Sequence, residues 1–151
     1  MQLALVGLGR MGADMARRLM RNGHQVVVTD IDPAAVQALA SEGAEASTSV
    51  ADAVSRLRAP RVLWSMVPAG DATELVVNEA LSVLSADDVL VDGANSHYKD
   101  SIRRAALAQE HQVGWLDAGV SGGVWGLAEG YNMMVGGSAA AFATVRPALE
   151  S

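Results

Sequence analysis

Short apolar runs alternate with segments of helical periodicity along the whole chain. The first run, Leu3–Val6, ends at a glycine, and apolar residues then recur at helical spacing from Met11 to Leu19. Further runs typical of strands cover residues 25–29, 44–46, 61–67, 89–92, 113–116 and 132–135. Helices are predicted over residues 11–21, 33–41, 50–57, 71–84, 97–110 and 139–149. Because strands that alternate with helices indicate βαβ units, the pattern predicts one α/β domain over residues 1–151, with a doubly wound, mostly parallel sheet and helices on both faces.

The composition narrows the possible functions. Half of the 151 residues are hydrophobic and only 4% are aromatic, so the core is expected to consist of Val, Leu, Ala and Met. The net charge is −6 and no basic stripe is present, which argues against nucleic-acid binding. The chain has no cysteine, which excludes disulfides and a thiol nucleophile. No apolar stretch reaches the ~20 residues of a membrane span and no signal peptide is recognisable, so a cytoplasmic location is expected.

The loop after the first predicted strand is rich in glycine. Residues 7–12 read Gly-Leu-Gly-Arg-Met-Gly and match G-x-G-x-x-G, a pattern that is common when taken alone. Here it follows a strand and opens a helix, and Asp30 ends the next strand, 18 residues after Gly12. That spacing is close to the ~20 residues expected for the carboxylate that binds the ribose of a dinucleotide. The sequence therefore predicts a Rossmann-type fold that binds a nicotinamide dinucleotide.

Each of these residue types has a physical role at such a site. Gly7 permits the tight turn, Gly9 lets the backbone approach a pyrophosphate, and Gly12 lets the helix pack close to the sheet. Free N–H groups and the positive end of the helix dipole then face the phosphates. Asp30 is expected to accept hydrogen bonds from both ribose hydroxyls of NAD. Since a 2′-phosphate would meet this carboxylate with no arginine directly after it, NAD is predicted in preference to NADP.

Three later loops follow the carboxyl ends of predicted strands. Residues 65–70 read Ser-Met-Val-Pro-Ala-Gly, and residues 92–100 read Asp-Gly-Ala-Asn-Ser-His-Tyr-Lys-Asp. Residues 117–126 read Asp-Ala-Gly-Val-Ser-Gly-Gly-Val-Trp-Gly. The carboxyl ends of parallel strands share one edge, where open α/β sheets bind ligands. These loops are therefore expected to converge with the glycine loop on one ligand.

Taken together, these stretches closely resemble the N-terminal domain of decarboxylating 6-phosphogluconate dehydrogenases, within the β-hydroxyacid dehydrogenase superfamily. The resemblance covers essentially the whole chain. The Val-Trp-Gly-Leu at 124–127 and the Gly-Tyr-x-x-Met-Val-Gly-Gly at 130–137 are most similar to the shorter, bacterial-type branch, which is often NAD-linked. The glycine fingerprint and the Ser-Gly-Gly at 121–123 are shared across the superfamily, whereas residues 95–100 and the Gly-Val-Trp-Gly at 123–126 are more discriminating. Where the family usually has Asp-Gly-Gly-Asn-Ser, this chain has Ala94, which requires a negative φ there.

The resemblance implies a role for each matching position. It implies that the cofactor is held by Gly7, Gly9, Arg10, Met11, Gly12, Asp30, Val67, Pro68, Ala69 and Asn95. It implies that the substrate, a sugar-acid phosphate, is bound by Asn95, Ser121, Gly122 and Gly123. A homo-oligomeric full-length enzyme is also implied.

Each assignment has a purely structural alternative. The glycine loop could be a turn that binds nothing, and Asn95 with Ser96 could only cap the following helix. Residues 121–123 could form an ordinary turn, and Met11 could be part of the core. The convergence of several loops on one edge favours the functional interpretation.

The resemblance places the catalytic lysine and glutamate, which transfer protons during oxidation and decarboxylation, on a long helix beyond the last strand. This sequence does not reach that helix, so we predict no catalytic residue in the chain and expect the C-terminal helical catalytic and dimerisation domain to be absent from it. Lys99, the only lysine, is expected on a helix surface, and His97 is the one histidine in the ligand-edge loops. No spacing typical of a metal site is present. The chain alone is expected to bind NAD with little turnover.

Two other functions are compatible with the sequence. A 3-hydroxyisobutyrate dehydrogenase or an imine reductase would use the same domain plan, although residues 95–100 favour the sugar acid. A non-catalytic NAD-binding module is the alternative from a different class. The oxidation of a hydroxyl group by an NAD(P)-dependent oxidoreductase is the activity predicted first.

Overall fold

A computed structural model describes the backbone of residues 1–151 and every side chain except that of Val124. Its strands form one sheet in the order β3-β2-β1-β4-β5-β6-β7, in which all neighbours are parallel except β6 and β7. The strands are β1 (Gln2–Val6), β2 (Gln25–Thr29), β3 (Glu45–Ala46), β4 (Val62–Ser65), β5 (Val89–Asp92), β6 (Gly114–Ser121) and β7 (Asn132–Gly137).

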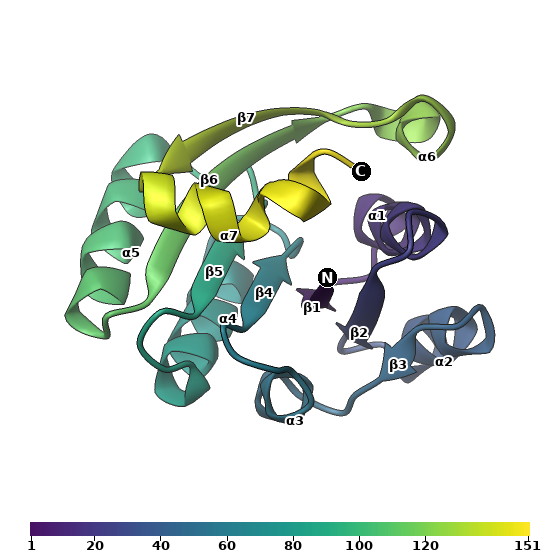
Figure 1. The fold of residues 1–151 in the computed structure, drawn as a ribbon, viewed down its shortest axis with the longest axis horizontal. Coiled ribbons are helices and arrows are strands. Elements are labelled where there is room, and N and C mark those ends of the chain that lie inside the picture. The colour runs from purple at the N-terminus through teal and green to yellow at the C-terminus, as the bar shows by residue number, and fades with distance from the viewer.

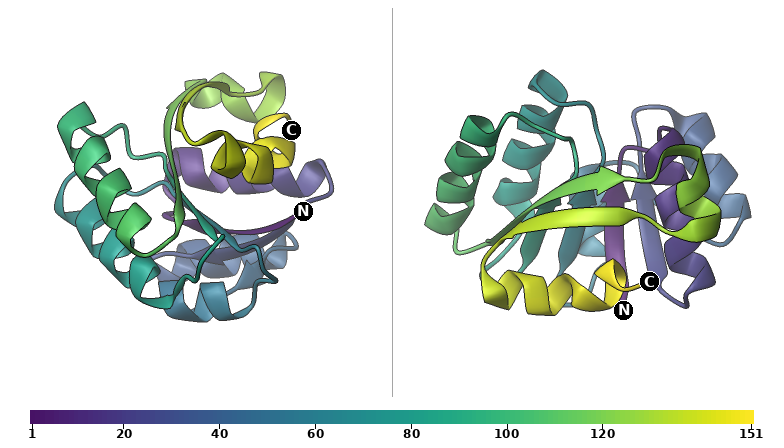
Figure 2. Two further views of the ribbon diagram at one scale, coloured as in Figure 1. Left: turned by 60° about the vertical axis from the view of Figure 1, so that its left-hand side comes forward. Right: turned by 90° about the horizontal axis from the view of Figure 1, so that it is seen from above.

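Helices cover both faces of this sheet (Figures 1 and 2). They are α1 (Arg10–Arg21), α2 (Pro33–Ser41), α3 (Val50–Ser55), α4 (Asp71–Val83), α5 (Tyr98–Glu110), α6 (Gly126–Glu129) and α7 (Ala139–Leu149), with a 3-10 helix, η1, at Gly123–Trp125. One apolar cluster packs α1, α2 and α7 against the sheet, and a second packs α3, α4 and α5 against its other face. The predicted doubly wound, mostly parallel α/β fold is confirmed.

The alternation of side chains along β1 shows how one strand serves both cores. Leu3 and Leu5 belong to the cluster under α1, whereas Ala4 and Val6 belong to the cluster under α4. Successive residues of a strand point to opposite faces, so a strand covered on both sides needs a continuous apolar run. The first run of the sequence therefore folds as a central strand.

Polar side chains fix the starts of several helices. Asp32 accepts a hydrogen bond from the N–H of Ala34, and Pro33 occupies the first helical position of α2. Ser138 accepts in the same way from the N–H of Ala141 and begins α7. Both helices span the predicted residues. None of the helices in the described structure is both long and apolar enough to cross a membrane.

The region after residue 116 differs from the prediction. The strand predicted over residues 113–116 continues as β6 to Ser121, and the expected loop contains η1 and α6. The glycine content of this stretch conceals the strand, because glycine lowers local strand propensity. Pairing with β7 supplies the missing stabilisation, with Ala118 opposite Val135 and Ser121 opposite Asn132.

Candidate functional site

The glycine loop joins β1 to α1 through a turn that requires glycine. Gly7 has a φ of 91°, in the left-handed region that other residues rarely adopt. At Gly12 a Cβ would lie 1.9 Å from the carbonyl oxygen of Gly7, so the helix can approach the loop this closely only without a side chain. The loop is therefore a compact support for the first turn of α1.

The start of α1 is a candidate anion site. Gly9 is the N-cap residue, and no described side chain caps the first turn of the helix. Backbone N–H groups at an uncapped helix start favour an anion, and the helix dipole adds to this preference. A Cβ placed on Gly9 would meet nothing within 4 Å, so the backbone there is open to a ligand. These features fit a pyrophosphate, which needs backbone donors and close approach.

Asp30 stands beside this loop at the end of β2. One of its carboxylate oxygens, Oδ2, accepts a hydrogen bond from the N–H of Leu8, and Oδ1 accepts one from the N–H of Asp32 at 2.8 Å. The N–H of Gly7 also donates to the carbonyl of Thr29 at 3.0 Å. These bonds hold the carboxylate next to the glycine loop while the side chain stays half-buried. Each carboxylate oxygen retains acceptor capacity for a sugar hydroxyl.

The loop after β4 lies directly against the glycine loop. A Cβ on Gly7 would lie 2.9 Å from the Cγ1 atom of Val67, so these two residues are in close contact. Pro68 and Ala69 are exposed, and the Oγ1 atom of Thr73 donates a hydrogen bond of 2.8 Å to the carbonyl of Pro68. The predicted cofactor-lining loop is thus fixed to the first turn of α4.

The buried carboxylate of Asp92 holds the loop after β5 through two hydrogen bonds. Asp92 Oδ1 accepts a hydrogen bond from the N–H of Ala94, and Asp92 Oδ2 accepts one from the Ser96 hydroxyl. Asn95 has a φ of 56°, a left-handed conformation that asparagine tolerates better than most residues, and its side chain is exposed. Ala94 is not among the residues with positive φ, as its methyl group requires.

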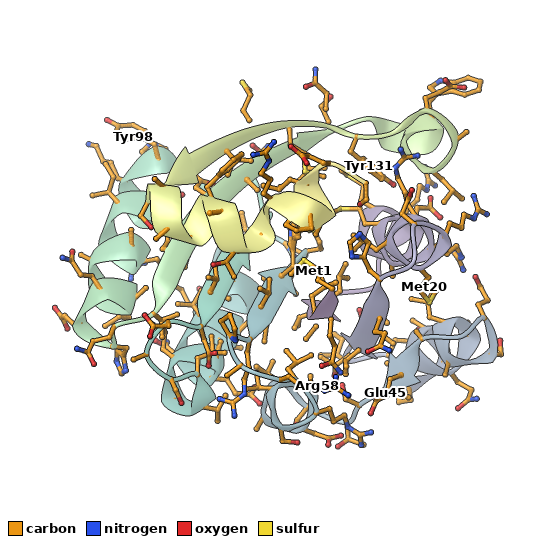
Figure 3. All side chains as sticks on the ribbon, in the orientation of Figure 1. Met1, Met20, Glu45, Arg58, Tyr98 and Tyr131 are labelled. Atoms are coloured by element: carbon orange, nitrogen blue, oxygen red, sulfur yellow. The ribbon has the colours of Figure 1, made fainter. Side chains whose placement is uncertain are left out.

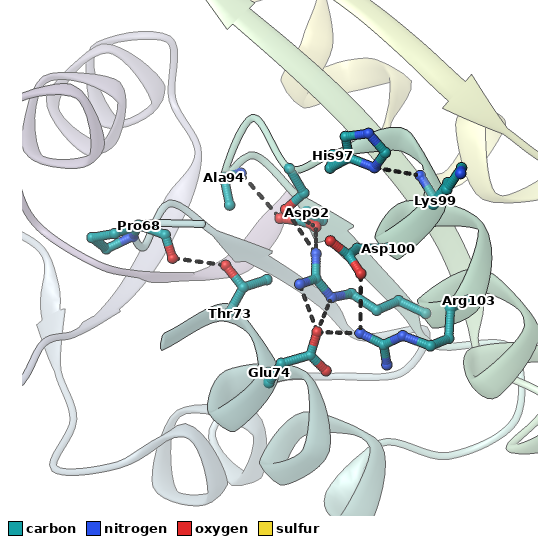
Figure 4. A network of polar contacts seen from close by, with 11 residues as sticks. Pro68, Thr73, Glu74, Asp92, Ala94, His97, Lys99, Asp100 and Arg103 are labelled. Carbon is teal, nitrogen blue, oxygen red and sulfur yellow. Dashed lines mark hydrogen bonds and ion pairs between the residues drawn. The ribbon is translucent and has the colours of Figure 1, made fainter. Parts of the chain in front are cut away.

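Asp92 belongs to a cluster of charged side chains in the interior, together with Arg104, Glu74 and Arg103 (Figure 4). The guanidinium of Arg104, only 1% exposed, donates to Ser96 Oγ at 2.7 Å, to Asp92 Oδ2 at 3.1 Å and to Glu74 Oε1 at 2.7 Å. Arg103 also donates to Glu74. The guanidinium groups of Arg103 and Arg104 hold the pKa of Glu74 below its ordinary value.

Residues 121–123 lie at the end of β6, on the same edge of the sheet. Ser121 and Gly123 are exposed, and Gly122 is half-buried. The segment that follows folds back over α1 (Figure 1), and Tyr131, labelled in Figure 3, packs against the apolar cluster that includes Met15 of α1. This packing fixes the end of the β6–β7 hairpin next to the helix that the glycine loop opens.

Comparison with known proteins identifies the family. Residues 2–151 match the sequence family described as the NAD binding domain of 6-phosphogluconate dehydrogenase. The chain belongs to this family. The resemblance noted from the sequence is thereby confirmed over the whole domain.

Two similar proteins illustrate the family. The NAD(+)-dependent, decarboxylating 6-phosphogluconate dehydrogenase of Haloferax volcanii is 43% identical over 151 residues, which are all of this chain and 50% of that protein. The NADP(+)-dependent, decarboxylating enzyme of Bacillus subtilis is 32% identical over 154 residues, 99% of this chain and 33% of that protein. The chain thus spans about half the length of the Haloferax enzyme and a third of the length of the Bacillus enzyme. Members of this family are named with either cofactor.

Solved structures of two related dehydrogenases share the fold. The Plasmodium falciparum 6-phosphogluconate dehydrogenase superposes with a TM-score of 0.92 at 27% identity, over 99% of this chain and 33% of that one. The Mycobacterium tuberculosis 3-hydroxyisobutyrate dehydrogenase gives a TM-score of 0.90 at 33% identity, over 99% and 50% of the two chains. The domain plan is common to both enzymes.

The predicted residues of this 6-phosphogluconate dehydrogenase-type domain lie together along one edge of the sheet. The ends of β1, β2, β4, β5 and β6 meet there, in the order of the strands. Met11 is half-buried at the start of α1, and Arg10 is exposed beside it. His97 accepts a hydrogen bond from the N–H of Lys99 and caps α5, so the cap falls on His97 rather than on Asn95 and Ser96.

Sequence patterns alone did not identify the charged cluster around Arg104. Arg104 shares a buried face of α5 with Ser101 and Ala108, and Glu74 lies 30 residues away on α4. A charged residue on the apolar face of a predicted helix was the available signal, because such a residue needs a buried partner.

A hollow of about 630 Å³ lies at the opposite edge of this domain, near the beginnings of β5 and β6. Its lining includes Val89, Gly114 and Ser138 and none of the predicted site residues. It is therefore separate from the edge on which the loops converge.

The lowered pKa of Glu74 gives a testable dependence of stability on pH. A carboxylate with a lowered pKa stabilises the fold fully above its ordinary pKa, and this contribution is lost as pH falls through the lowered value. We expect Glu74→Gln to lower the thermal unfolding midpoint at pH 7, and the difference from the unaltered chain to shrink below about pH 4. Thermal unfolding followed by circular dichroism between pH 7 and 2 measures this.

Glu79→Gln on the same helix is the matched control for this experiment. Glu79 is exposed and forms no ion pair in the described part of the chain, and its carboxylate accepts a 3.3 Å hydrogen bond from the N–H of Ala51 that a glutamine Oε1 can also accept. Its substitution is expected to change the midpoint little at any pH. A difference for Glu74→Gln that stays constant down to pH 2 would show that its charge is not the stabilising feature.

Proposed function

We propose that this chain binds NAD and forms the cofactor-binding half of a decarboxylating 6-phosphogluconate dehydrogenase. The observation that carries the proposal is the joint geometry of the glycine loop and Asp30. An open backbone at Gly9, an uncapped start of α1 and a carboxylate fixed at the end of β2 lie side by side. They match the pyrophosphate and ribose of one dinucleotide.

The order of the strands supports a placement of the two halves of the cofactor. Asp30 at the end of β2 would bind the adenosine ribose, and Gly9 with Arg10 and Met11 would bind the pyrophosphate. The nicotinamide half would extend the other way, over the loops after β4 and β5. Those loops contribute the predicted residues Val67, Pro68, Ala69 and Asn95.

The substrate would lie beyond the nicotinamide half of the cofactor. Asn95 together with Ser121, Gly122 and Gly123 would bind the sugar acid through side-chain hydrogen bonds and backbone N–H groups. Bound NAD would supply the hydride acceptor for oxidation of a secondary alcohol. The chain's own residues bind and orient the two reactants, and the proton-transfer residues would lie outside these 151 residues.

Preference for NAD rests on charge at the end of β2. The Asp30 carboxylate would repel a 2′-phosphate, and the next two residues, Ile31 and Asp32, supply no positive charge. Ile31 is fully exposed and uncharged.

Titration with NADH and NADPH tests the cofactor and its preference together. We expect saturable binding of NADH, with NADPH at least ~10-fold weaker because charge repulsion and one unpaired hydrogen bond oppose it. Asp30→Asn is expected to weaken NADH binding and to narrow the difference between the two cofactors. Energy transfer from tryptophan to the bound reduced cofactor provides the signal, with Trp125 72% exposed close to Ser121.

Glu110→Gln is the control for the charge change. Glu110 is exposed at the far end of α5, and its substitution removes one negative charge without altering the site. It is expected to leave both affinities unchanged. Absence of NADH binding by the unaltered chain would contradict the proposed function.

A 3-hydroxyisobutyrate dehydrogenase-like activity is the second candidate. The similarity to the mycobacterial 3-hydroxyisobutyrate dehydrogenase, 33% identical with a TM-score of 0.90, favours it. Calorimetry with the NAD-loaded chain separates the candidates, because 6-phosphogluconate and 3-hydroxyisobutyrate differ in size and charge. Binding of 6-phosphogluconate alone would support the first proposal, and binding of 3-hydroxyisobutyrate alone would support the second.

A further inference from the structure

The two loops assigned to the nicotinamide half share one buried cation. The loop after β5 reaches Arg104 through Ser96 and through Asp92, which also binds the N–H of Ala94. The loop after β4 reaches the same cation through α4, because Glu74 in the first turn of that helix accepts hydrogen bonds from Arg104. Figure 4 shows the two carboxylates, Asp92 and Glu74, on either side of this network.

The connection to the loop after β4 is short and direct. Thr73 is completely buried and donates a 2.8 Å hydrogen bond to the carbonyl of Pro68, and Glu74 is the next residue of the chain. A shift of α4 relative to α5 would therefore move Pro68 and the exposed Ala69 with it. At their bases the two loops are joined directly, because the N–H of Gly93 donates a 2.8 Å hydrogen bond to the carbonyl of Ser65. Farther out, at Pro68 and Ser96, the link between them runs through Glu74 and Arg104.

The centre of the cluster is a buried ion pair, and the side chain of Glu74 at its outer side is 31% exposed. Arg104 and Asp92 are each 1% exposed, and Arg104 donates through three nitrogen atoms, to two carboxylates and one hydroxyl. A planar guanidinium fixes the directions of its hydrogen bonds, which a lysine ammonium would not do. A buried charge of this kind is costly to leave unpaired, so the partners stay together.

We propose that Arg104 is a positioning residue that sets the spacing of residues 66–70 and 93–97 for the nicotinamide half of NAD. This inference rests on the proposed function. Its main effect is expected on one half of the cofactor. Asp30 and the glycine loop form no hydrogen bond with any member of the cluster in the described part of the chain, and they meet its loops through the packing of Gly7 against Met66 and Val67. ADP-ribose, which lacks the nicotinamide, is therefore the discriminating probe.

Calorimetric titration of the 151-residue chain with NADH and with ADP-ribose tests the proposal. Arg104→Met removes the charged hydrogen bonds and keeps the aliphatic stem. We expect it to weaken NADH binding about 10-fold, as loss of a hydrogen bond to a charged group would, and to leave ADP-ribose affinity unchanged. Arg103→Met is the matched control, since Arg103 contacts the same Glu74 but is 53% exposed and touches neither Asp92 nor Ser96.

Ser96→Ala tests the proposal if Arg104→Met folds poorly because Asp92 has lost its partner. Ser96→Ala removes the hydroxyl between Arg104 and the loop after β5 but keeps the pairs of Arg104 with Asp92 and Glu74. We expect NADH binding to weaken several-fold with ADP-ribose affinity unchanged.

Two results would overturn the inference. One is unchanged NADH affinity in folded Arg104→Met and in Ser96→Ala. The other is an equal loss of NADH and ADP-ribose affinity, which would show that the cluster only maintains the fold. Failure of the unaltered chain to bind either ligand would instead reject the proposed function, and this inference with it.

Discussion

Replacement of Gly12 by alanine is expected to destabilise the chain more than any other single methyl addition in the glycine loop. The new methyl group would lie 1.9 Å from the carbonyl oxygen of Gly7 and 3.3 Å from the Cδ2 atom of Leu5. The oxygen belongs to the backbone of a tight turn, so it cannot move aside without shifting β1 or α1. Alanine is a better helix former than glycine by about 1 kcal/mol, which acts in the opposite direction.

The steric clash is expected to outweigh the gain in helix propensity. Overpacking in a well-packed interior typically costs about 1–3 kcal/mol, and here the clash is with backbone, so we expect a net loss of at least about 2 kcal/mol. For a domain of this size such a loss lowers the thermal unfolding midpoint by roughly 5 °C or more. Differential scanning calorimetry measures it.

Gly9→Ala is the matched control for stability. The same methyl group three residues earlier meets nothing within 4 Å, and Gly9 has a φ of −59°, which alanine adopts freely. Its midpoint is expected to stay the same or to rise slightly. Equal midpoints for Gly12→Ala and the unaltered chain would show that the loop relaxes at no cost.

Local signals in the sequence were sufficient for most of the fold. The central strands are continuous apolar runs because both of their faces are buried, and this pattern is readable without knowledge of partners. Asp32 and Pro33 marked the start of α2 in the same local way. The glycine loop and Asp30 could be placed together because the strands β1 and β2 that carry them are neighbours in sequence and in the sheet.

Features that depend on distant partners could not be predicted. The extension of β6 to Ser121 exists because β7 pairs with it, and the glycine-rich sequence alone reads as a loop. The position of Arg104 on the inner face of its helix indicates a buried partner but not which one, because Glu74 and Asp92 come to it from two other elements. Sequence spacing indicates which residues share an edge of the sheet, but not which charges support that edge from inside.

The largest expected effect on binding is that of Gly9→Ala, which leaves the fold intact. Its methyl group would point into the open space in front of the uncapped first turn of α1, where we place the pyrophosphate. A steric cost near 3 kcal/mol corresponds to about 100-fold weaker binding. We expect a loss of this size for NADH and for ADP-ribose alike, because both contain the pyrophosphate.

Gly136→Ala is the control for this loss of affinity. Gly136 lies on β7, and a Cβ there also meets nothing within 4 Å, so the substitution adds the same methyl group away from the glycine loop. Its affinity for both ligands is expected to equal that of the unaltered chain. We expect Gly9→Ala to lose NADH and ADP-ribose binding equally, and Arg104→Met to lose NADH binding alone. These two results together would separate the pyrophosphate contact from the positioning of the nicotinamide loops. Unchanged affinity in a folded Gly9→Ala chain would instead place the pyrophosphate away from the start of α1.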